Sequence, residues 1–193
     1  IHIHDLDYYP TKTTTCIQYD LDDLFERGFR TKNGSIRTPQ SIQSYATLAT
    51  IIFQTNQNEQ HGGQAIPAFD FFMAKGVRKT HLKHLQTLTD FYREVEGKEP
   101  NEDALKKIEE KALAMTRKDT HQAMEGFIHN LNTMHSRGGN QVVFSSINYG
   151  TDTSAEGRMV IEELLKATIE GLGSRGEAVS YTHLRAHETD SYL

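Results

Sequence analysis

Hydrophobic residues recur at helical spacing along most of the chain. Counted from residue 42, they return three, four, seven, ten and eleven positions further on, which predicts one apolar face of a helix. Thr38-Pro39 is the expected N-cap and first position of that helix, and the polar residues 56–60 are its expected end. The helices predicted from spacing, caps and glycines cover residues 20–28, 38–56, 69–96, 101–137 and 154–172.

The two longest helical patterns meet at a break. Residues 97–100 contain a glycine and a proline, and Asn101 is the expected cap of the second helix. Two long helices joined by so short a connection predict an antiparallel hairpin. The second helix is charged between residues 106 and 111 and more apolar from residue 124 onward, so we expect its second half to pack against a neighbour.

Residues 141–148 alternate as a strand does. Phe144, Ser146 and Asn148 would share one face, and Ser145 and Ile147 the other. Hydroxyl and amide groups on a buried strand need hydrogen-bond partners. Neighbouring backbone is the commoner partner, and a bound ligand is the other.

The only cysteine follows three threonines. Residues 13–15 are β-branched and favour extended backbone, so Cys16 is predicted on or near a strand, with Thr14 on its face. A lone cysteine is more often a buried structural residue than a reactive one. Further along, His61-Gly62-Gly63-Gln64 combines two glycines that let a ligand approach the backbone closely. A bare turn is the alternative at this second stretch.

Composition excludes several classes of protein. The chain has 193 residues, a formal net charge of -5 and 36% hydrophobic residues, and its mean hydropathy is -0.61. With a pI near 6.1 it offers no basic surface for nucleic acid. The sequence contains no apolar run of membrane-spanning length, and no signal peptide is recognised at its start. One cysteine excludes an internal disulfide and fits a reducing cytoplasm.

Four groups of short runs resemble one enzyme family in order and spacing. They are residues 1–16 (IHIHDLDYYPTKTTTC), 37–42 (RTPQSI) with 56–64 (NQNEQHGGQ), 129–137 (HNLNTMHSR) and 141–152 (QVVFSSINYGTD). Together they resemble the catalytic barrel of anaerobic (class III) ribonucleoside-triphosphate reductases, which are glycyl-radical enzymes. The resemblance covers residues 1–173 approximately.

The resemblance implies an α/β fold, the N-terminal part of a ten-stranded α/β barrel with a flanking helical bundle. It implies a dimer and effector region at about residues 40–135. Residues 174–193 do not continue the family pattern, and from 180 onward they show neither helical nor strand periodicity, so we interpret them as a translated sequencing adapter that stays unpacked.

The resemblance also assigns site residues. Cys16 matches the cysteine that protonates the leaving 2′-hydroxyl of the ribose and then takes part in its reduction. The expected substrate-binding residues are Thr14, Thr15, His61, Gly62, Gly63, Gln64, Ser145, Ser146 and Asn148. Ribonucleoside triphosphates would be the substrates, and dNTPs or ATP the effectors.

Further components follow for a full-length enzyme of this family. They are a glycyl radical made by a radical-SAM activating enzyme, a second cysteine, a structural zinc and, in many members, formate as reductant. The single cysteine means that the second one lies outside this sequence, and we expect the radical glycine and the zinc site to lie outside it too. The segment alone is therefore expected to be inactive, to hold no cofactor and to form a homodimer without membrane or nucleic-acid contacts.

Other functions compete with this interpretation. His2 and His4, on one face of an extended segment, would start a zinc site with Asp5 or Asp7, but no further ligand pattern follows. A cysteine hydrolase would need a family signature around the thiol, which the sequence lacks. The strongest rival is a nucleotide-sensing and dimerisation module without catalysis of its own.

Overall fold

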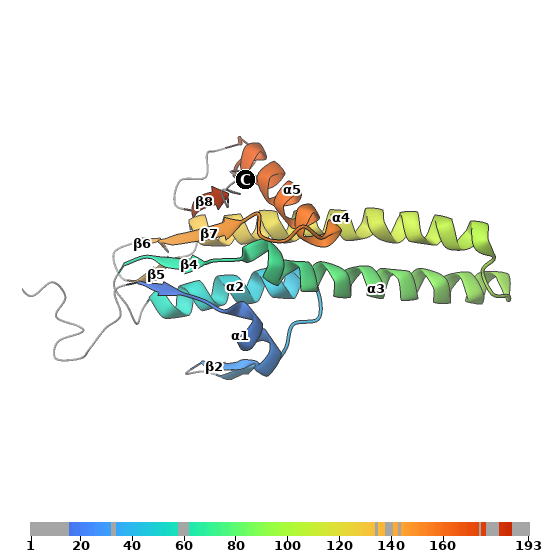
Figure 1. Cartoon of the computed structure of the whole chain (residues 1–193), viewed down its shortest axis with the longest axis horizontal. Coiled ribbons are helices and arrows are strands. Elements are labelled where there is room, and N and C mark those ends of the chain that lie inside the picture. The colour runs from blue at the N-terminus through green and yellow to red at the C-terminus, as the bar shows by residue number, and fades with distance from the viewer. Residues whose placement is uncertain are drawn as a thin grey trace, which may run out of the picture.

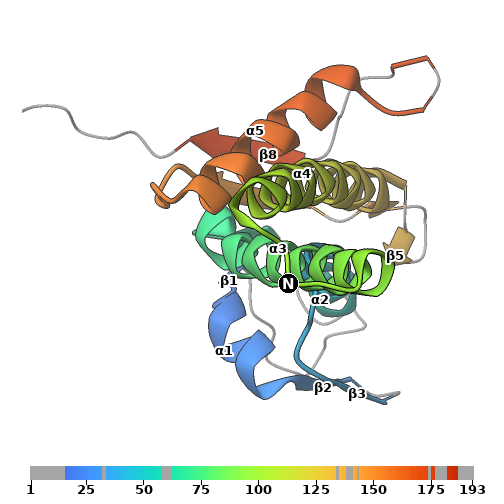
Figure 2. The same ribbon diagram turned by 90° about the vertical axis from the view of Figure 1, so that its right-hand side faces the viewer.

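A computed structural model of the chain describes residues 16–31, 34–57, 62–133, 135–137, 141–142, 144–173, 175–176 and 182–186. Within these residues the fold is α/β and rich in helix, as predicted. Long helices lie side by side against one parallel sheet, and a hairpin of two helices extends well beyond it (Figure 1). Seen along the hairpin, α3 and α4 lie one above the other, with α1 below them and α5 above (Figure 2).

The elements alternate between strand and helix through the part of the chain that forms the sheet. In chain order they are β1 (Ile17–Gln18), α1 (Leu21–Arg27), β2 (Phe29–Thr31), β3 (Gly34–Ile36), α2 (Ile42–Gln57), β4 (Gln64–Ile66), α3 (Phe69–Glu96), α4 (Glu102–Thr133), β5 (His135–Arg137), β6 (Gln141–Val142), β7 (Ser145–Tyr149), α5 (Ala155–Glu170) and β8 (Thr182–Ala186).

The main sheet has the order β1-β4-β7-β8, and all three of its pairings are parallel. Its register places Ile17 beside Gln64, and Gln64 beside Ser145. Parallel neighbours require long crossover connections. Here α1 and α2 lie between β1 and β4, the α3–α4 hairpin between β4 and β7, and α5 between β7 and β8. Two antiparallel pairs, β2–β3 and β5–β6, lie outside this sheet.

Three of the predicted helices start at a side-chain cap, and Asn101 confirms the cap predicted for α4. The Asp20 side chain accepts a hydrogen bond of 3.0 Å from the backbone N–H of Asp22 at the start of α1. Asn101 accepts one of 2.9 Å from the N–H of Ala104, and Ser154 accepts one of 3.0 Å from the N–H of Gly157. These side chains satisfy backbone donors that have no partner inside the helix.

The start of α2 differs from the prediction. The helix begins at Ile42 rather than at Thr38, because the Ser44 hydroxyl accepts hydrogen bonds from the N–H groups of Gln40 and Ser41. Thr38 instead donates its hydroxyl to the carbonyl oxygen of Glu26, just before the end of α1. A cap therefore forms three residues later than its sequence signature indicates.

Two further boundaries are also corrected. Helix α4 ends at Thr133, and His135–Arg137 pairs as β5 with β6 instead of continuing the helix to residue 137. The strand predicted over residues 141–148 is divided into β6 and β7. The predicted alternation is confirmed for β7, where Ser145 and Ile147 are buried and Ser146 is half-buried.

The hydrophobic core lies between the sheet and the helices. Phe53 of α2, Phe69 of α3 and Phe127 of α4 are almost fully buried, and the Phe69 and Phe127 ring centroids are 4.9 Å apart. Ile66 and Ile147 of the sheet join the same cluster. The helices therefore cover one face of the sheet, and this face is its apolar side.

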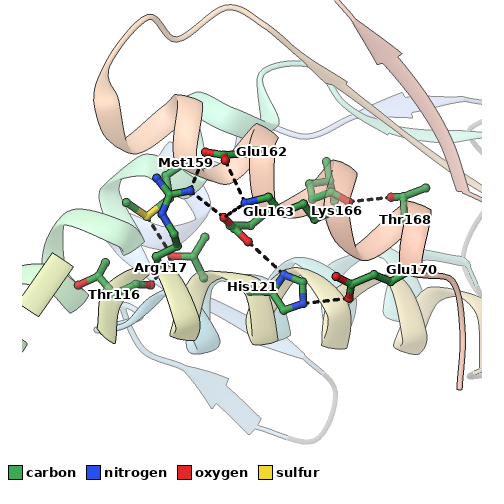
Figure 3. Close-up of polar contacts among 11 residues, drawn as sticks. Thr116, Arg117, His121, Met159, Glu162, Glu163, Lys166, Thr168 and Glu170 are labelled. Carbon is green, nitrogen blue, oxygen red and sulfur yellow. Dashed lines mark hydrogen bonds and ion pairs between the residues drawn. The ribbon is translucent and has the colours of Figure 1, made fainter. Parts of the chain in front are cut away.

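A polar cluster joins α4 to α5 (Figure 3). At its centre Glu163, only 3% exposed, accepts hydrogen bonds of 2.9 Å from both Arg117 and Lys166. The Nδ1 atom of His121 lies 3.1 Å from its other oxygen. The carboxylate is buried, and it is held by cationic groups from both helices.

The C-terminal prediction is wrong in one respect. We expected no ordered element after residue 180, but Thr182–Ala186 pairs in parallel with the whole of β7 as β8. The open edge of β7 has free backbone donors and acceptors, which an extended segment can satisfy. None of the helices that the structure describes is long and apolar enough to cross a membrane.

Candidate functional site

A cavity of about 430 Å³ opens over the first residues of three neighbouring strands. Its lining comes from β1, β4 and β7 and the residues just before them, namely Cys16, Ile17, Gln18, Gly63, Gln64, Ala65, Phe144, Ser145 and Ser146. Backbone hydrogen bonds hold these segments together. The N–H of Ile17 donates to the carbonyl of Gly63 over 3.2 Å, and the N–H of Gln64 donates to that of Phe144 over 3.1 Å.

Strand geometry divides the lining into two faces. Residues paired across parallel strands share a face, so Ile17, Gln64 and Ser145 lie together, and the last two are buried toward the helices. The alternate residues Gln18, Ala65 and Ser146 lie together on the opposite face. Their greater exposure identifies this second face as the open one.

The structure brings Cys16 and β7 to the same cavity. Cys16 precedes Ile17, so it belongs to the open face with Ser146, and its side chain is exposed. Asn148 lies two residues beyond Ser146, on that face and half-buried. Three residues that the sequence predicted for one site, from segments about 130 residues apart, thus share one side of one sheet.

Other predicted residues are placed differently. Ser145 is 1% exposed, on the helix-covered face, and its hydroxyl has no hydrogen-bond partner among the described residues. Gly62 is exposed with a φ of 91°, a backbone conformation that glycine favours. Thr14, Thr15 and His61 lie outside the described residues, as do His2 and His4 of the alternative zinc site.

Gly63 and Phe144 lie beside each other in the lining of the cavity. A Cβ atom on Gly63 would lie 3.5 Å from Cδ1 of Phe144, which is an ordinary van der Waals distance, so the ring lies directly beside the residue that precedes β4. Phe144 is 50% exposed, so its ring offers apolar surface at the mouth of the cavity that it lines. Phe144 was not among the site residues predicted from the sequence. The signal that could have identified it is its position two residues before Ser146, on the same face of the strand.

The Gln64 side chain lies on the helix-covered face. Its Oε1 atom accepts a hydrogen bond from the Tyr19 hydroxyl, and its Nε2 atom donates to the Phe53 carbonyl over 3.0 Å and to Gln57 Oε1 over 2.9 Å. Burial raises the pKa of Tyr19 well above its ordinary value. The hydroxyl therefore stays protonated and continues to donate at any physiological pH.

The chemistry available on the open face is that of a thiol beside hydroxyl and amide groups. A thiol gives up a proton or a hydrogen atom, and serine and asparagine hold hydroxylated ligands by hydrogen bonds. The cavity volume is within the range of small-molecule sites. Among the residues that the structure describes, no group of three or more histidine, cysteine or acidic side chains is arranged to hold a metal ion.

A second, larger cavity of about 920 Å³ lies around the start of α2. Its lining runs from Ser35 to Leu48 and includes the guanidinium-bearing Arg37. Hydroxyl and amide side chains supply most of the other polar groups, namely Thr38, Gln40, Ser41, Gln43, Ser44 and Thr47.

Comparison with known proteins gives one consistent result. A sequence model described as anaerobic ribonucleoside-triphosphate reductase matches residues 1–190. The reductase of that name from Enterobacteria phage T4 is 32% identical over 177 residues, which is 91% of this chain and 27% of the relative. The one from Escherichia coli is 28% identical over 185 residues, 95% of this chain and 24% of the relative.

The fold comparison agrees with the sequence comparison. The crystal structure of the anaerobic ribonucleotide reductase from Thermotoga maritima superposes with a TM-score of 0.52 and 14% identity, over 85% of this chain and 27% of that one. At this identity the likeness is evidence of the fold alone. The chain spans about a quarter of the length of these relatives.

Proposed function

The chain belongs to the anaerobic ribonucleoside-triphosphate reductase family, and from this premise we propose that it forms the Cys16-bearing wall of a reductase active site. The reaction would be the radical-based reduction of ribonucleoside triphosphates to deoxyribonucleotides under anaerobic conditions. The observation that carries the proposal is the shared open face of Cys16 and Ser146, which lies over one cavity.

Each residue of that face has a chemical role in the proposal. The Cys16 thiol gives a proton to the departing 2′-hydroxyl of the ribose, which leaves as water, and then contributes to the reduction. Ser146 and Asn148 offer hydrogen bonds to the ribose hydroxyl groups. Gly63 has no side chain and lets the sugar approach the backbone, and Phe144 supplies an apolar wall.

The proposed setting is the first part of a ten-stranded α/β barrel. The parallel order β1-β4-β7, with helices on one face and the candidate site on the other, supports this architecture. The remaining components would come from other parts of a full-length cytoplasmic enzyme. They are the glycyl radical, the second cysteine and a structural zinc, so this segment would be inactive alone. A separate radical-SAM activating enzyme would make the radical, and formate would be the external reductant.

Replacement of Cys16 by serine in the full-length reductase that carries this segment tests the proposal. Cys16→Ser changes little volume at an exposed position, so the free energy of unfolding is expected to change by less than about 1 kcal/mol. Deoxynucleotide formed per radical is expected to fall by orders of magnitude, since general acid catalysis alone contributes roughly 10²–10⁴-fold. Radical content should be unchanged, and Thr87→Ser on the outer side of α3 should keep full turnover. Equal yields from Cys16→Ser and wild type would reduce Cys16 to a structural thiol.

A second candidate function is a nucleotide-effector and dimerisation module. Two observations favour it: the Arg37 cavity at the start of α2, and exposed apolar side chains on the projecting hairpin, among them Phe91 and Val95 at 62% and 63% exposure. A guanidinium beside hydroxyl groups suits a triphosphate, and an apolar helix face suits a second copy of the chain.

This second candidate is tested by titrating ATP and dATP into the chain while its mass is followed by sedimentation. Arg37→Ala is expected to weaken nucleotide binding at least about tenfold, as the loss of a charge-assisted hydrogen bond does. Phe91→Ser is expected to shift dimers toward monomers without changing nucleotide affinity. A chain that neither binds nucleotide nor dimerises leaves only the catalytic-wall proposal.

A further inference from the structure

The carboxamide of Gln64 is completely occupied inside the protein. The residue is 1% exposed. Its nitrogen donates two hydrogen bonds, to the Phe53 carbonyl and to Gln57, both in the last turns of α2. Its oxygen accepts from the Tyr19 hydroxyl, and Asn56 Nδ2 lies 3.5 Å from the same oxygen. An amide side chain has two donor hydrogens and two acceptor lone pairs, so no position is left for a substrate.

The orientation of this amide follows from its partners. The Phe53 carbonyl can only accept, so the atom facing it must be the Gln64 nitrogen. The oxygen then faces Tyr19, whose hydroxyl donates to it. Tyr19 is 8% exposed and packs its ring edge-on against Phe53, with centroids 5.7 Å apart. The link between Gln64 and Tyr19 is thus fixed both by polarity and by packing.

Tyr19 lies immediately after β1, three residues from Cys16. Strand β1 is only two residues long. Besides its pairing with β4, its segment donates backbone hydrogen bonds from Ile17 N–H to the Gly63 carbonyl, 3.2 Å, and from Tyr19 N–H to the Ala65 carbonyl, 3.0 Å. So short a strand at the edge of a sheet is weakly held by its own backbone. The Gln64–Tyr19 bond adds a side-chain anchor beside these two.

We propose that Gln64 is a positioning residue, which anchors β1 to β4 and α2 through Tyr19 and so holds Cys16 over the cavity, on the same face of the sheet as Ser146. The catalytic consequence of this inference rests on the proposed function of Cys16. The anchoring of β1 by Gln64 does not depend on that function. It replaces the expectation that Gln64 binds substrate. Gln64 acts on Cys16 through Tyr19 and strand β1. Its neighbours Gly63 and Ala65 line the cavity, so the ligand contacts these residues and not the Gln64 side chain.

Hydrogen exchange of single amides tests the anchoring in the 193-residue chain. Gln64→Met keeps the length of the side chain and removes its hydrogen bonds, so the Ile17 and Tyr19 amides are expected to exchange about three- to tenfold faster, as the loss of a buried hydrogen bond implies. Amides of α5 should be unchanged. Tyr19→Phe removes a single hydroxyl and should accelerate the same two amides by a smaller factor, which keeps the test open if Gln64→Met fails to fold.

Thr50→Val is the matched control. Thr50 is 2% exposed and bonds to the Ala46 carbonyl within α2, so its loss disturbs the same helix without touching β1. Unchanged Ile17 and Tyr19 exchange in both Gln64→Met and Tyr19→Phe would overturn the inference. So would equal acceleration at those amides in Thr50→Val, or acceleration throughout α5.

Turnover of the full-length reductase separates positioning from general stability. Gln64→Met and Tyr19→Phe are expected to lower kcat at least about fivefold with KM nearly constant, because substrate contacts remain while the thiol is displaced. Thr50→Val should change neither. A rise of KM at constant kcat would return Gln64 to substrate binding and overturn the inference. If Cys16→Ser retains turnover while Gln64→Met still frees β1, the proposed function fails and the anchoring stands.

Discussion

The Oδ2 atom of Asp70 accepts a hydrogen bond of 2.8 Å from the backbone N–H of Asp152, about eighty residues further along the chain. The same oxygen accepts from Gly150 N–H over 2.9 Å, and Oδ1 accepts from the Thr151 hydroxyl over 3.1 Å. Asp70 lies in the first turn of α3 and is fully buried. It therefore joins the end of β4, through α3, to the turn that follows β7.

Asp70→Ala is expected to lower the free energy of unfolding by about 2–4 kcal/mol, because two backbone N–H groups lose a carboxylate acceptor. Asp70→Asn should cost less, since one carbonyl oxygen remains to accept. Urea denaturation of the chain measures both. Asp90→Asn, on the exposed side of α3, is the control and should stay within about 0.5 kcal/mol of wild type. A loss for Asp70→Ala as small as that of the control would show that water replaces the carboxylate.

The Glu163 cluster predicts a loss of stability in acid. Burial acts to raise the pKa of Glu163, but hydrogen bonds from Lys166 and Arg117 outweigh it, and the pKa lies below its ordinary value. Hydrogen bonds from Arg117 and Lys166 lower the pKa of Glu162 to about 2. A carboxylate whose pKa is lower in the folded state stabilises the fold above its unfolded pKa, and this contribution is lost as the pH falls through the folded value.

Glu163→Gln is therefore expected to cost about 1–3 kcal/mol at pH 7, and the difference from wild type should narrow as the pH falls below about 4.5, the ordinary pKa of a glutamate. Thermal unfolding between pH 2 and pH 7 measures this difference. Glu110→Gln at an exposed position of α4 should show little effect at any pH. A gap between Glu163→Gln and wild type that widens in acid would contradict the assigned sign.

Two glycines inside helices predict opposite effects of one substitution. A Cβ atom on Gly76 of α3 would lie 2.9 Å from the Tyr45 ring and 3.2 Å from the Cα atom of Ile42. Gly76→Ala should lower stability by about 1–3 kcal/mol by overpacking α3 against α2. A Cβ atom on Gly126 of α4 would meet nothing within 4 Å, so Gly126→Ala should stabilise by roughly 0.5–1 kcal/mol through helix propensity. Melting curves that move in the same direction would contradict the described α2–α3 contact.

Phe144→Ala tests the apolar wall of the candidate site. Removal of the half-exposed ring opens the cavity and should raise KM for the nucleotide about tenfold in the full-length reductase, since a ring contact contributes about 1–1.5 kcal/mol. Global stability should change little. Ile169→Ala, at a position 85% exposed on α5, serves as the control for loss of a surface apolar group. An unchanged KM would leave Phe144 without a role in substrate binding.

Sequence reasoning succeeded where a local signal acts on nearby backbone. Asp20, Asn101 and Ser154 cap helices because each side chain reaches an N–H group two or three residues away. The alternation of β7 likewise follows from strand geometry alone. These parts of the fold depend on neighbours in the sequence.

The features that the sequence alone does not predict depend on distant partners. Ser145 and Ser146 are chemically alike, so only the position of the helices decides which one is buried. The amide of Gln64 could bind a ligand as well as a protein group, and its partner in the structure, Tyr19, is 45 residues away in the sequence. Thr38 does not cap α2, because its hydroxyl donates to the carbonyl of Glu26 in the preceding helix, and β8 pairs with the edge of β7, a strand more than thirty residues earlier in the sequence.

The pairing of Ala65 with Ser146 has a kinetic consequence. These neighbours of the candidate site lie about eighty residues apart in sequence, with the whole α3–α4 hairpin between them. Closing so long a loop is slow unless the intervening chain is already compact, and a helical hairpin forms from local contacts. We therefore expect the hairpin to fold first and to bring β7 beside β4, so that the cavity is assembled at the end of folding.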